Sequence, residues 1–233
     1  MKKLTLYKLL VFNLLMCFGA IGQSEKIVCV GAHPDDPETG MGGTLAKYIA
    51  EGHDVYIIYL TTGEAGIANL SHKKAATIRK KEAECANEVL GTKSIFLGQI
   101  DGQTIYTPKW ENKLNEILRK INPDIVYTHW PVDSHRDHQI ASLLTYQNWL
   151  KMDKHFDMYY FEVCTDYQTM GFKPTDYVDI TAYQEIKKAA VDCHTSQKPE
   201  EIYHDPHCNH FGMMKKRGEE MGVSAAEAFI RLY

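Results

Sequence analysis

The feature that most constrains the fold is an alternation of short apolar runs with helix-like segments. Residues 26–32 form a continuous apolar run typical of a buried parallel strand, and residues 54–60 form a second one. Between them, a polar loop leads through Gly42-Gly43-Thr44 into a predicted helix. A strand, a helix and a strand within about 35 residues indicate a βαβ unit with parallel pairing and a right-handed crossover.

The same alternation continues along the chain. Apolar runs predict further strands at residues 94–97, 124–129 and 158–163, and helical spacing predicts helices at residues 75–90, 110–121, 138–150 and 183–194. We therefore expect an α/β, Rossmann-like fold in a single domain, with a mostly parallel sheet covered by helices on both faces. Ligands of such sheets bind in the loops that leave the carboxyl ends of the strands. The three glycines Gly40, Gly42 and Gly43 lack the G-x-G-x-x-G order of a dinucleotide-binding loop.

The N-terminus has the three-part pattern of a secretory signal peptide at residues 1–22, which leaves residues 23–233 as the domain. The pattern predicts a secreted or periplasmic protein. The apolar run is too short to span a bilayer comfortably, so we expect no stable membrane span after the leader is cleaved. A lipoprotein anchored through Cys17 is less favoured, because the bulky Met16 precedes that cysteine.

Composition excludes one class of partner. The chain has 233 residues, 44% hydrophobic and 24% charged, and a formal net charge of -4. Nucleic acid is not expected as a partner, because its recognition depends on clustered Lys and Arg. The basic run that includes Arg79, at residues 73–81, is read as the solvated face of a helix. Cys29 is predicted to be a small core residue, and the sequence leaves the disulfide pairing open.

Two short motifs combine imidazole with carboxylate. His-Pro-Asp-Asp at residues 33–36 directly follows the first strand, and His-Arg-Asp-His at residues 135–138 follows the fourth. These side chains suit zinc, and three protein ligands plus a water are the arrangement of a catalytic zinc site. One of the neighbouring residues Asp35 and Asp36 can bind the metal while the other faces the water. The spacing alone does not decide which aspartate has which role.

These motifs and several others resemble the PIG-L/LmbE-like deacetylases. That family includes enzymes that deacetylate N-acetylglucosaminyl-phosphatidylinositol, and the glucosaminyl deacetylases of mycothiol and bacillithiol synthesis. The similarity runs in order along the chain and is carried by residues 32–38, 42–45, 61–66, 79–91, 96–102, 133–138, 194–197 and 226–229. The last two segments are similar to bacillithiol-type members.

The resemblance implies a role for each residue of the two motifs. His33, Asp36 and His138 become the ligands of Zn²⁺, with Fe²⁺ as the alternative metal. Asp35 becomes the general base. His135, taken as protonated, stabilises or protonates the tetrahedral intermediate.

Three other features have alternative interpretations. Arg79 resembles a family position that contacts a polar appendage of the substrate, with a helix-surface cation as the alternative. Asp137 is expected either to orient His135 or His138 or to cap a helix. The late histidines His204, His207 and His210 are read as part of a polar loop, rather than as a sugar site or a second metal site.

The function implied by the resemblance is metal-dependent removal of the acetyl group from an N-acetylated amino sugar of the N-acetylglucosamine type. The leader favours an exported small-molecule or glycan substrate. Two alternatives stay open: a hydrolase of another amide that uses the same zinc site, and a catalytically silent sugar-binding protein. The intact Asp35 argues against the second alternative. The sequence also leaves the oligomeric state open, a homo-oligomer included.

Overall fold

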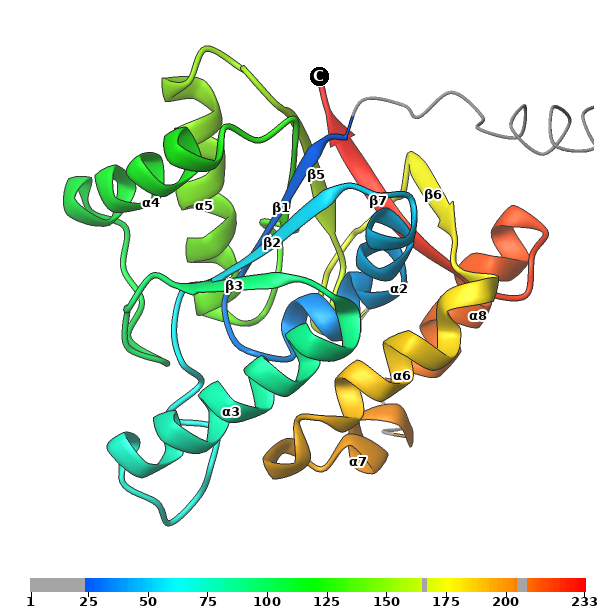
Figure 1. The fold of residues 1–233 in the computed structure, drawn as a ribbon, viewed down its shortest axis with the longest axis horizontal. Helices are drawn as coiled ribbons and strands as arrows, with labels where there is room; N and C mark the ends of the chain where they lie inside the picture. Colours follow the sequence, from blue (N-terminus) through cyan, green and yellow to red (C-terminus); the bar gives the residue numbers. More distant parts are fainter. Residues whose placement is uncertain (1–23, 165–166, 205–208) are drawn as a thin grey trace, which may run out of the picture.

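The computed structural model describes residues 24–164, 167–204 and 209–233 (Figure 1). The expected leader at residues 1–22, Cys17 and His207 lie outside these residues. Within them, one sheet has the strand order β3-β2-β1-β4-β5-β7-β6. Its strands are β1 (Lys26–Gly31), β2 (Asp54–Tyr59), β3 (Lys93–Phe96), β4 (Ile125–His129), β5 (Asp157–Phe161), β6 (Asp176–Asp179) and β7 (Ala226–Leu232).

The pairing confirms the α/β fold with a mostly parallel sheet. Strands β1 to β5 pair in parallel, whereas β7 runs antiparallel to both β5 and β6. The order reverses at β1, which has β2 on one side and β4 on the other. This switch point opens a crevice at the carboxyl ends of β1 and β4, where open α/β sheets bind their ligands.

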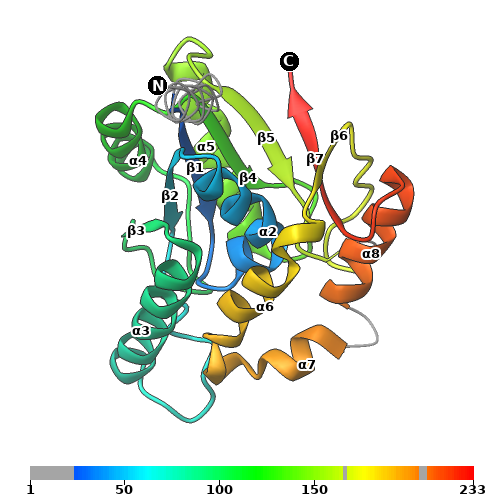
Figure 2. The same cartoon turned by 45° about the vertical axis from the view of Figure 1, so that its right-hand side comes forward.

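Helices cover both faces of the sheet, as expected (Figures 1 and 2). Val28 and Val30 of β1 pack on one face with the apolar side of α4 (Pro108–Ile121) and α5 (Arg136–Lys151). Ile27 and Cys29 point to the other face. There they pack with α2 (Asp36–Ala50), α3 (His72–Leu90) and α6 (Gln184–Asp192). Cys29 is buried, as predicted.

The predicted helices and strands match the structure except at a few ends, but the entry to α2 differs. The segment expected as a polar loop before Gly42 is helical from Asp36 onward, but α2 is kinked at Met41, so its second part begins at Gly42, where the sequence placed the helix. Pro37 in the first turn and the Glu38 carboxylate, which accepts the backbone N–H of Asp35 at 3.0 Å, favour this early start. A Cβ added to Gly43 would lie 2.7 Å from Ile180, so this glycine allows close packing of the helix.

The C-terminal part adds elements that the apolar pattern did not predict: β6, β7, α7 (Pro199–His204) and α8 (His210–Met221). Strand β7 fixes α2 through the buried Glu227, whose carboxylate accepts the backbone N–H groups of Gly43 and Thr44 and pairs with Lys187. His210 is buried in α8, so it does not belong to an exposed polar loop. No helix in the described part of the chain is long and apolar enough to cross a bilayer.

Candidate active site

The first motif lies on a strained turn at the carboxyl end of β1. Asp35 is the residue before α2 and has a backbone φ of 106°, a value that residues other than glycine rarely adopt. Such strain is found at functional sites, where the surrounding structure enforces it. The His33 Nδ1 atom lies 3.1 Å from Asp36 Oδ2. The turn therefore separates the two aspartates, with Asp36 toward His33 and Asp35 away from it.

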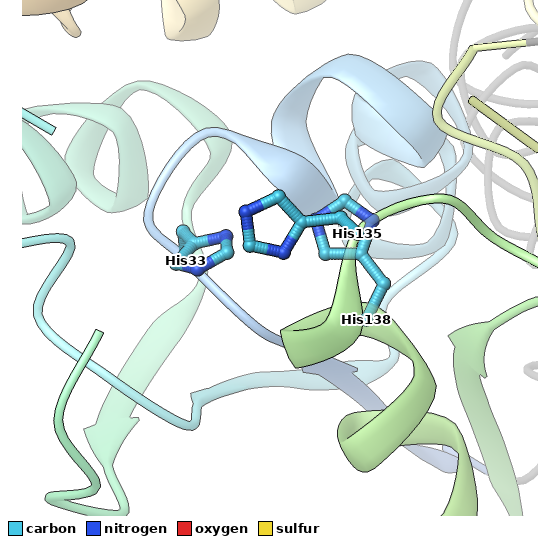
Figure 3. A group of neighbouring side chains, drawn as sticks. All are labelled: His33, His135 and His138. Atoms are coloured by element: carbon cyan, nitrogen blue, oxygen red, sulfur yellow. The ribbon is translucent and has the colours of Figure 1, made fainter. Parts of the chain in front are cut away.

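The second motif forms the start of α5. His135 is the residue before this helix, and its Nδ1 accepts the backbone N–H of Asp137 at 3.2 Å. His138 follows in the first turn, with Nε2 3.3 Å from Asp36 Oδ1. Figure 3 shows His33, His135 and His138 side by side, and the ring centroids of His33 and His135 are 4.8 Å apart. The two motifs thus meet across the switch point of the sheet.

Three overlapping groups of these side chains could hold a metal ion, with ligand atoms within 4.8 Å of one another. One joins His33, His135 and His138, and another joins Asp36 with His129 and His138. The expected trio of His33, Asp36 and His138 is spread over these two groups, which share His138. The geometry therefore brings the expected ligands together and adds His135 and His129 as neighbours.

The orientation of His138 fits a metal ligand. Its Nδ1 lies 3.2 Å from Asp133 Oδ2, and its Nε2 faces Asp36. A histidine that binds a metal through one nitrogen usually donates its other N–H to a carboxylate. Asp133 also accepts the backbone N–H of His135 and so braces both histidines. The sequence motif included Asp133, but spacing alone gave no sign of this role.

Two more residues contact the site. His129, at the end of β4, is fully buried, and its Nε2 accepts the backbone N–H of Ala32 at 3.0 Å. Asp101, in the loop after β3, lies 3.1 Å from His33 Nε2 and accepts the backbone N–H of Ala65. His129 ends β4 and Asp101 follows β3, so both lie at the carboxyl edge of the sheet, where ligands of such sheets bind.

The histidines and carboxylates of the cluster stabilise one another's charged forms. Burial disfavours charged groups here, but the carboxylate of Asp36 outweighs it and, with Asp133, raises the pKa of His138 to about 9. In the same way burial opposes ionisation of Asp36, yet His138 and His33 hold its pKa well below the usual range. Burial, with His138 and His33, lowers the pKa of His135. This direction favours a neutral His135 ring while His33 and His138 carry charge.

Arg79 lies against Asp35. Its Nη2 donates to Asp35 Oδ2 at 2.8 Å and to the carbonyl of Pro34, and its Nη1 lies 3.3 Å from Glu82 Oε2. The side chain is 2% exposed, so the alternative of a helix-surface cation is wrong, although Lys73 and the other lysines of that run are exposed. Burial raises the pKa of Asp35, and the neighbouring Arg79 opposes that rise.

Asp137 joins the site to the loop after β3. Its buried carboxylate accepts the backbone N–H of Gly102 and the hydroxyl of Thr104, each at 2.7 Å. The same group lies 3.2 Å from His33 Nε2. In the hydrogen bonds that it makes, the carboxylate serves the neighbouring loop and His33 and does not cap α5.

A cavity of about 340 Å³ opens above the cluster. Its volume falls in the range of small-molecule sites, about 300–1,000 Å³. The wall comes from loops after β1, β2, β3 and β4 and from two segments of the α3–α6 side: His33, Asp35, Gly63, Ala65, Gly66, Arg79, Asp101, Gly102, His135 and Gln197. Asp35 and His135 thus line one space.

Known proteins are similar to this chain in sequence and in fold. The chain is 32% identical over 195 residues to the diacetylchitobiose deacetylase of Thermococcus kodakarensis. The matched stretch covers 77% of this chain and 72% of that protein. The structure of N,N'-diacetylchitobiose deacetylase from Pyrococcus horikoshii is similar, with a TM-score of 0.79, 28% identity and coverage of 99% and 92% of the two chains. The 4-oxalmesaconate hydratase of Pseudomonas putida is 24% identical, over 88% of this chain and 86% of that protein.

A family model supports the same grouping. The model described as PIG-L, GlcNAc-PI de-N-acetylase, matches residues 28–149, the part that runs from β1 through α5 and includes both motifs. With a match to half of the sequence and a relative above 30% identity along most of it, the chain belongs to the PIG-L family.

Proposed function

We propose that this protein is a metal-dependent hydrolase that removes the acetyl group from an N-acetylated amino sugar and releases acetate. The observation that carries the proposal is one cavity that Asp35 and His135 both line, above a histidine and aspartate cluster. The deacetylases from Thermococcus kodakarensis and Pyrococcus horikoshii, which act on diacetylchitobiose, support the substrate class.

The donor set fits a divalent metal of the zinc type. His33, Asp36 and His138 would hold it, and imidazole with carboxylate suits Zn²⁺, with Fe²⁺ as the alternative. When bound, the metal supplies a Lewis acid that makes a water molecule acidic enough to attack near neutral pH. The carboxylate of Asp133 supports the assignment, because it fixes His138 with Nε2 toward Asp36.

The chain's own residues then move the protons. Asp35 accepts a proton from the attacking water, and its buried setting raises its pKa, which suits a general base. His135 Nδ1 accepts the Asp137 N–H, so a neutral His135 carries its proton on Nε2. That N–H would stabilise the charge that gathers on the carbonyl oxygen. A proton returned to the nitrogen completes the cleavage into acetate and a free amine.

Arg79 and Asp137 keep supporting roles in the proposal. Arg79 lines the cavity, so a polar group of the substrate can reach its guanidinium beside Asp35. Asp137 orients His33 and ties the loop after β3 to the site.

We also propose that the protein is exported. The support is the leader pattern at residues 1–22 together with the disulfide between Cys85 and Cys193, since disulfides persist in oxidising compartments. Cys164 is disulfide-bonded as well. Fractionation of cells, with mass determination of the mature N-terminus, tests this point; a full-length protein in the cytosol would contradict it.

A substrate panel tests the reaction. We expect protein loaded with zinc or iron(II) to release acetate from N-acetylglucosamine, its short oligomers, phosphorylated forms or glycosides, and to lose that activity in chelator. 4-Oxalmesaconate belongs in the same panel, because the 4-oxalmesaconate hydratase of Pseudomonas putida is 24% identical to this chain. Hydration of that compound without acetate release from any sugar would contradict the proposal. Sugar binding without acetate release would favour a catalytically silent sugar-binding protein. Cleavage of other amides alone would favour a hydrolase of another amide that uses the same metal site.

A further inference from the structure

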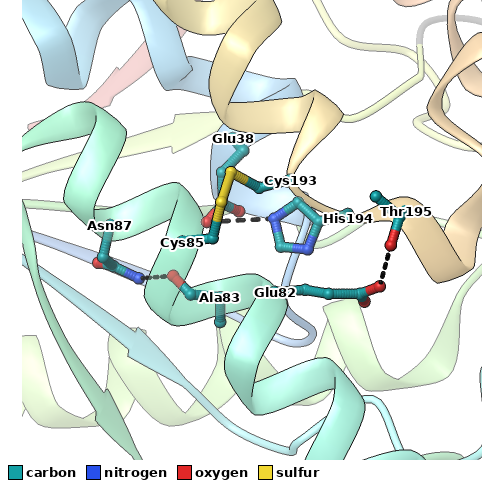
Figure 4. The surroundings of a disulfide bond; sticks show 8 residues. All are labelled: Glu38, Glu82, Ala83, Cys85, Asn87, Cys193, His194 and Thr195. Carbon is teal, nitrogen blue, oxygen red and sulfur yellow. Dashed lines mark hydrogen bonds and ion pairs between the residues drawn. A yellow bond between two sulfur atoms is a disulfide. The ribbon is translucent and has the colours of Figure 1, made fainter.

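A disulfide joins two segments that are 108 residues apart in sequence. Cys85 lies in α3, and Cys193 directly follows α6 (Figure 4). Their Cα atoms are 5.8 Å apart. Cys85 is exposed, so a reducing agent in solution can reach the bond. The cross-link therefore holds the end of α6, and the residues that follow it, against the middle of α3.

The segment after Cys193 is bound to Glu82, one turn before Cys85 on α3. We call residues 194–197 the strap. The Glu82 carboxylate, 6% exposed, accepts hydrogen bonds from Thr195 Oγ1 at 3.0 Å, Ser196 N at 2.6 Å and Ser196 Oγ at 2.7 Å. A buried carboxylate with three donors has one orientation, because any rotation would leave donors and charge without partners.

Glu82 in turn contacts the guanidinium that binds the general base. Its Oε2 lies 3.3 Å from Arg79 Nη1, and Arg79 Nη2 donates to Asp35 Oδ2 at 2.8 Å. Gly63 leaves the space for this guanidinium, since a Cβ there would lie 2.8 Å from Arg79 Nε. The strap, Glu82, Arg79 and Asp35 thus form one continuous series of contacts from the disulfide to the cavity.

A second contact runs from the strap to the same aspartate. His194 is fully buried, and its Nε2 lies 3.6 Å from Glu38 Oε1 (Figure 4). The other oxygen of Glu38 accepts the backbone N–H of Asp35 at 3.0 Å. The strap therefore supports the backbone of Asp35 through Glu38 and its carboxylate through Glu82 and Arg79. Gln197, the last strap residue, lines the cavity itself.

We propose that Glu82 is a positioning residue for the deacetylation: clamped by the strap and the Cys85–Cys193 disulfide, it fixes Arg79 so that the Asp35 carboxylate stays aimed into the cavity. The inference rests on the proposed role of Asp35 as base. Asp35 occupies a strained backbone conformation, which persists only because surrounding contacts hold the residue in place. The contact with Arg79 is the one that holds its carboxylate. A displacement of about 1 Å at such a group costs up to about 10²-fold in rate.

The test compares matched variants by kcat, KM and zinc content. Glu82→Gln keeps the shape but removes the charge that holds Arg79, and we expect kcat to fall about 10–100-fold with zinc retained. Glu84→Gln, an exposed carboxylate on the same helix, is the control and should leave kcat unchanged. Equal kcat for Glu82→Gln and wild type would overturn the proposal.

The strap is tested without touching Arg79 or Asp35. Thr195→Val removes the hydroxyl that Glu82 accepts, whereas Thr195→Ser keeps it. We expect Thr195→Val combined with Ser196→Ala to lower kcat about tenfold, and Thr195→Ser alone to behave as wild type. An equal loss in Thr195→Ser and Thr195→Val would overturn the proposal, because the hydroxyl would then have no part in the effect.

The disulfide is tested by reduction. Wild-type protein in tris(2-carboxyethyl)phosphine should lose severalfold in kcat and match the Cys85→Ser/Cys193→Ser double variant, which the reductant should not slow further. Full activity of the reduced wild type would overturn the part assigned to the disulfide. A further loss in the reduced double variant would contradict it too, since the effect would then come from another bond.

A structural readout separates this proposal from the proposed function. Wild-type protein that releases no acetate from any sugar of the panel refutes the deacetylase, whatever the variants do. The crystal structure of Glu82→Gln then decides the positioning role: Arg79 displaced from Asp35 supports it, and an unchanged contact of 2.8 Å overturns it.

Discussion

Replacement of Asp137 by alanine should destabilise the protein by a predictable amount. The carboxylate is 1% exposed and accepts two hydrogen bonds at 2.7 Å, from the backbone N–H of Gly102 and the hydroxyl of Thr104. It also contacts His33 Nε2 at 3.2 Å. Because α5 carries Asp137 and the loop after β3 carries both donors, the variant disconnects two walls of the cavity.

The two donors do not lose equally. Thr104 is fully buried, so no water can replace Asp137 as the acceptor of its hydroxyl. The loss of this hydrogen bond should therefore cost about 1–3 kcal/mol. Gly102 is exposed, and water can satisfy its N–H, so its loss should add about 1 kcal/mol or less. We therefore expect Asp137→Ala to lower the free energy of unfolding by about 1–4 kcal/mol and the Tm by about 2–16 °C.

The assay is urea unfolding of protein freed of metal by chelation, because a bound ion would add its own stabilisation. Thr104→Val is the matched variant, since valine keeps the shape of threonine and lacks the hydroxyl. The double variant should be more stable than the sum of the two losses predicts, by about 1–2 kcal/mol, because the valine needs no partner. A loss below about 1 kcal/mol in Asp137→Ala, or strict additivity with Thr104→Val, would refute this reasoning.

Other predictions concern packing, alkaline pH and the metal. Gly43→Ala should cost about 1–3 kcal/mol in urea unfolding, because its Cβ would lie 2.7 Å from the buried Ile180; wild-type stability would contradict this packing. Burial raises the pKa of Tyr160 to about 12, above its unfolded value, so its contribution is complete below about pH 10 and is lost as pH rises toward 12. Tyr160→Phe should therefore flatten the fall in stability between pH 10 and 12 by no more than about 2 kcal/mol, and an unchanged slope would show the shift to be absent. Zinc at about 1,000 times its Kd should raise the Tm of chelated protein by about 8–16 °C, and a Tm that does not respond would contradict a metal site in the folded protein.

The sheet could be predicted as far as its parallel strands, because each is a continuous apolar run next to a helix. Strand β7 could not, because Glu227 and Arg231 interrupt its apolar run and it gains its place by pairing with β5, some distance back along the chain. The first part of α2 was not predicted either, because glycine normally weakens a helix. Here Gly43 is required by the close approach of Ile180, a tertiary contact that no local pattern contains.

The site shows the same limit. Its histidines and aspartates were predictable because they repeat a dense motif after a strand. Asp101 and Asp133 are single acidic residues in loops, and their contacts with His33 and His138 depend on how the loops fold. Arg79 was placed near the substrate by resemblance, but its pairing with Asp35 and burial became visible only in three dimensions.

The most direct test of the central claim separates metal binding from catalysis at two neighbouring residues. Asp35→Asn keeps the shape of the side chain and tolerates the positive φ of that position, so we predict that it binds zinc as wild type does and loses about 10²–10⁴-fold in acetate release. His138→Ala should lose the zinc itself. Zinc content by elemental analysis and acetate release from N-acetylated sugars, measured on the same preparations, give the answer. Near wild-type turnover in Asp35→Asn, or full zinc in His138→Ala, would contradict the account.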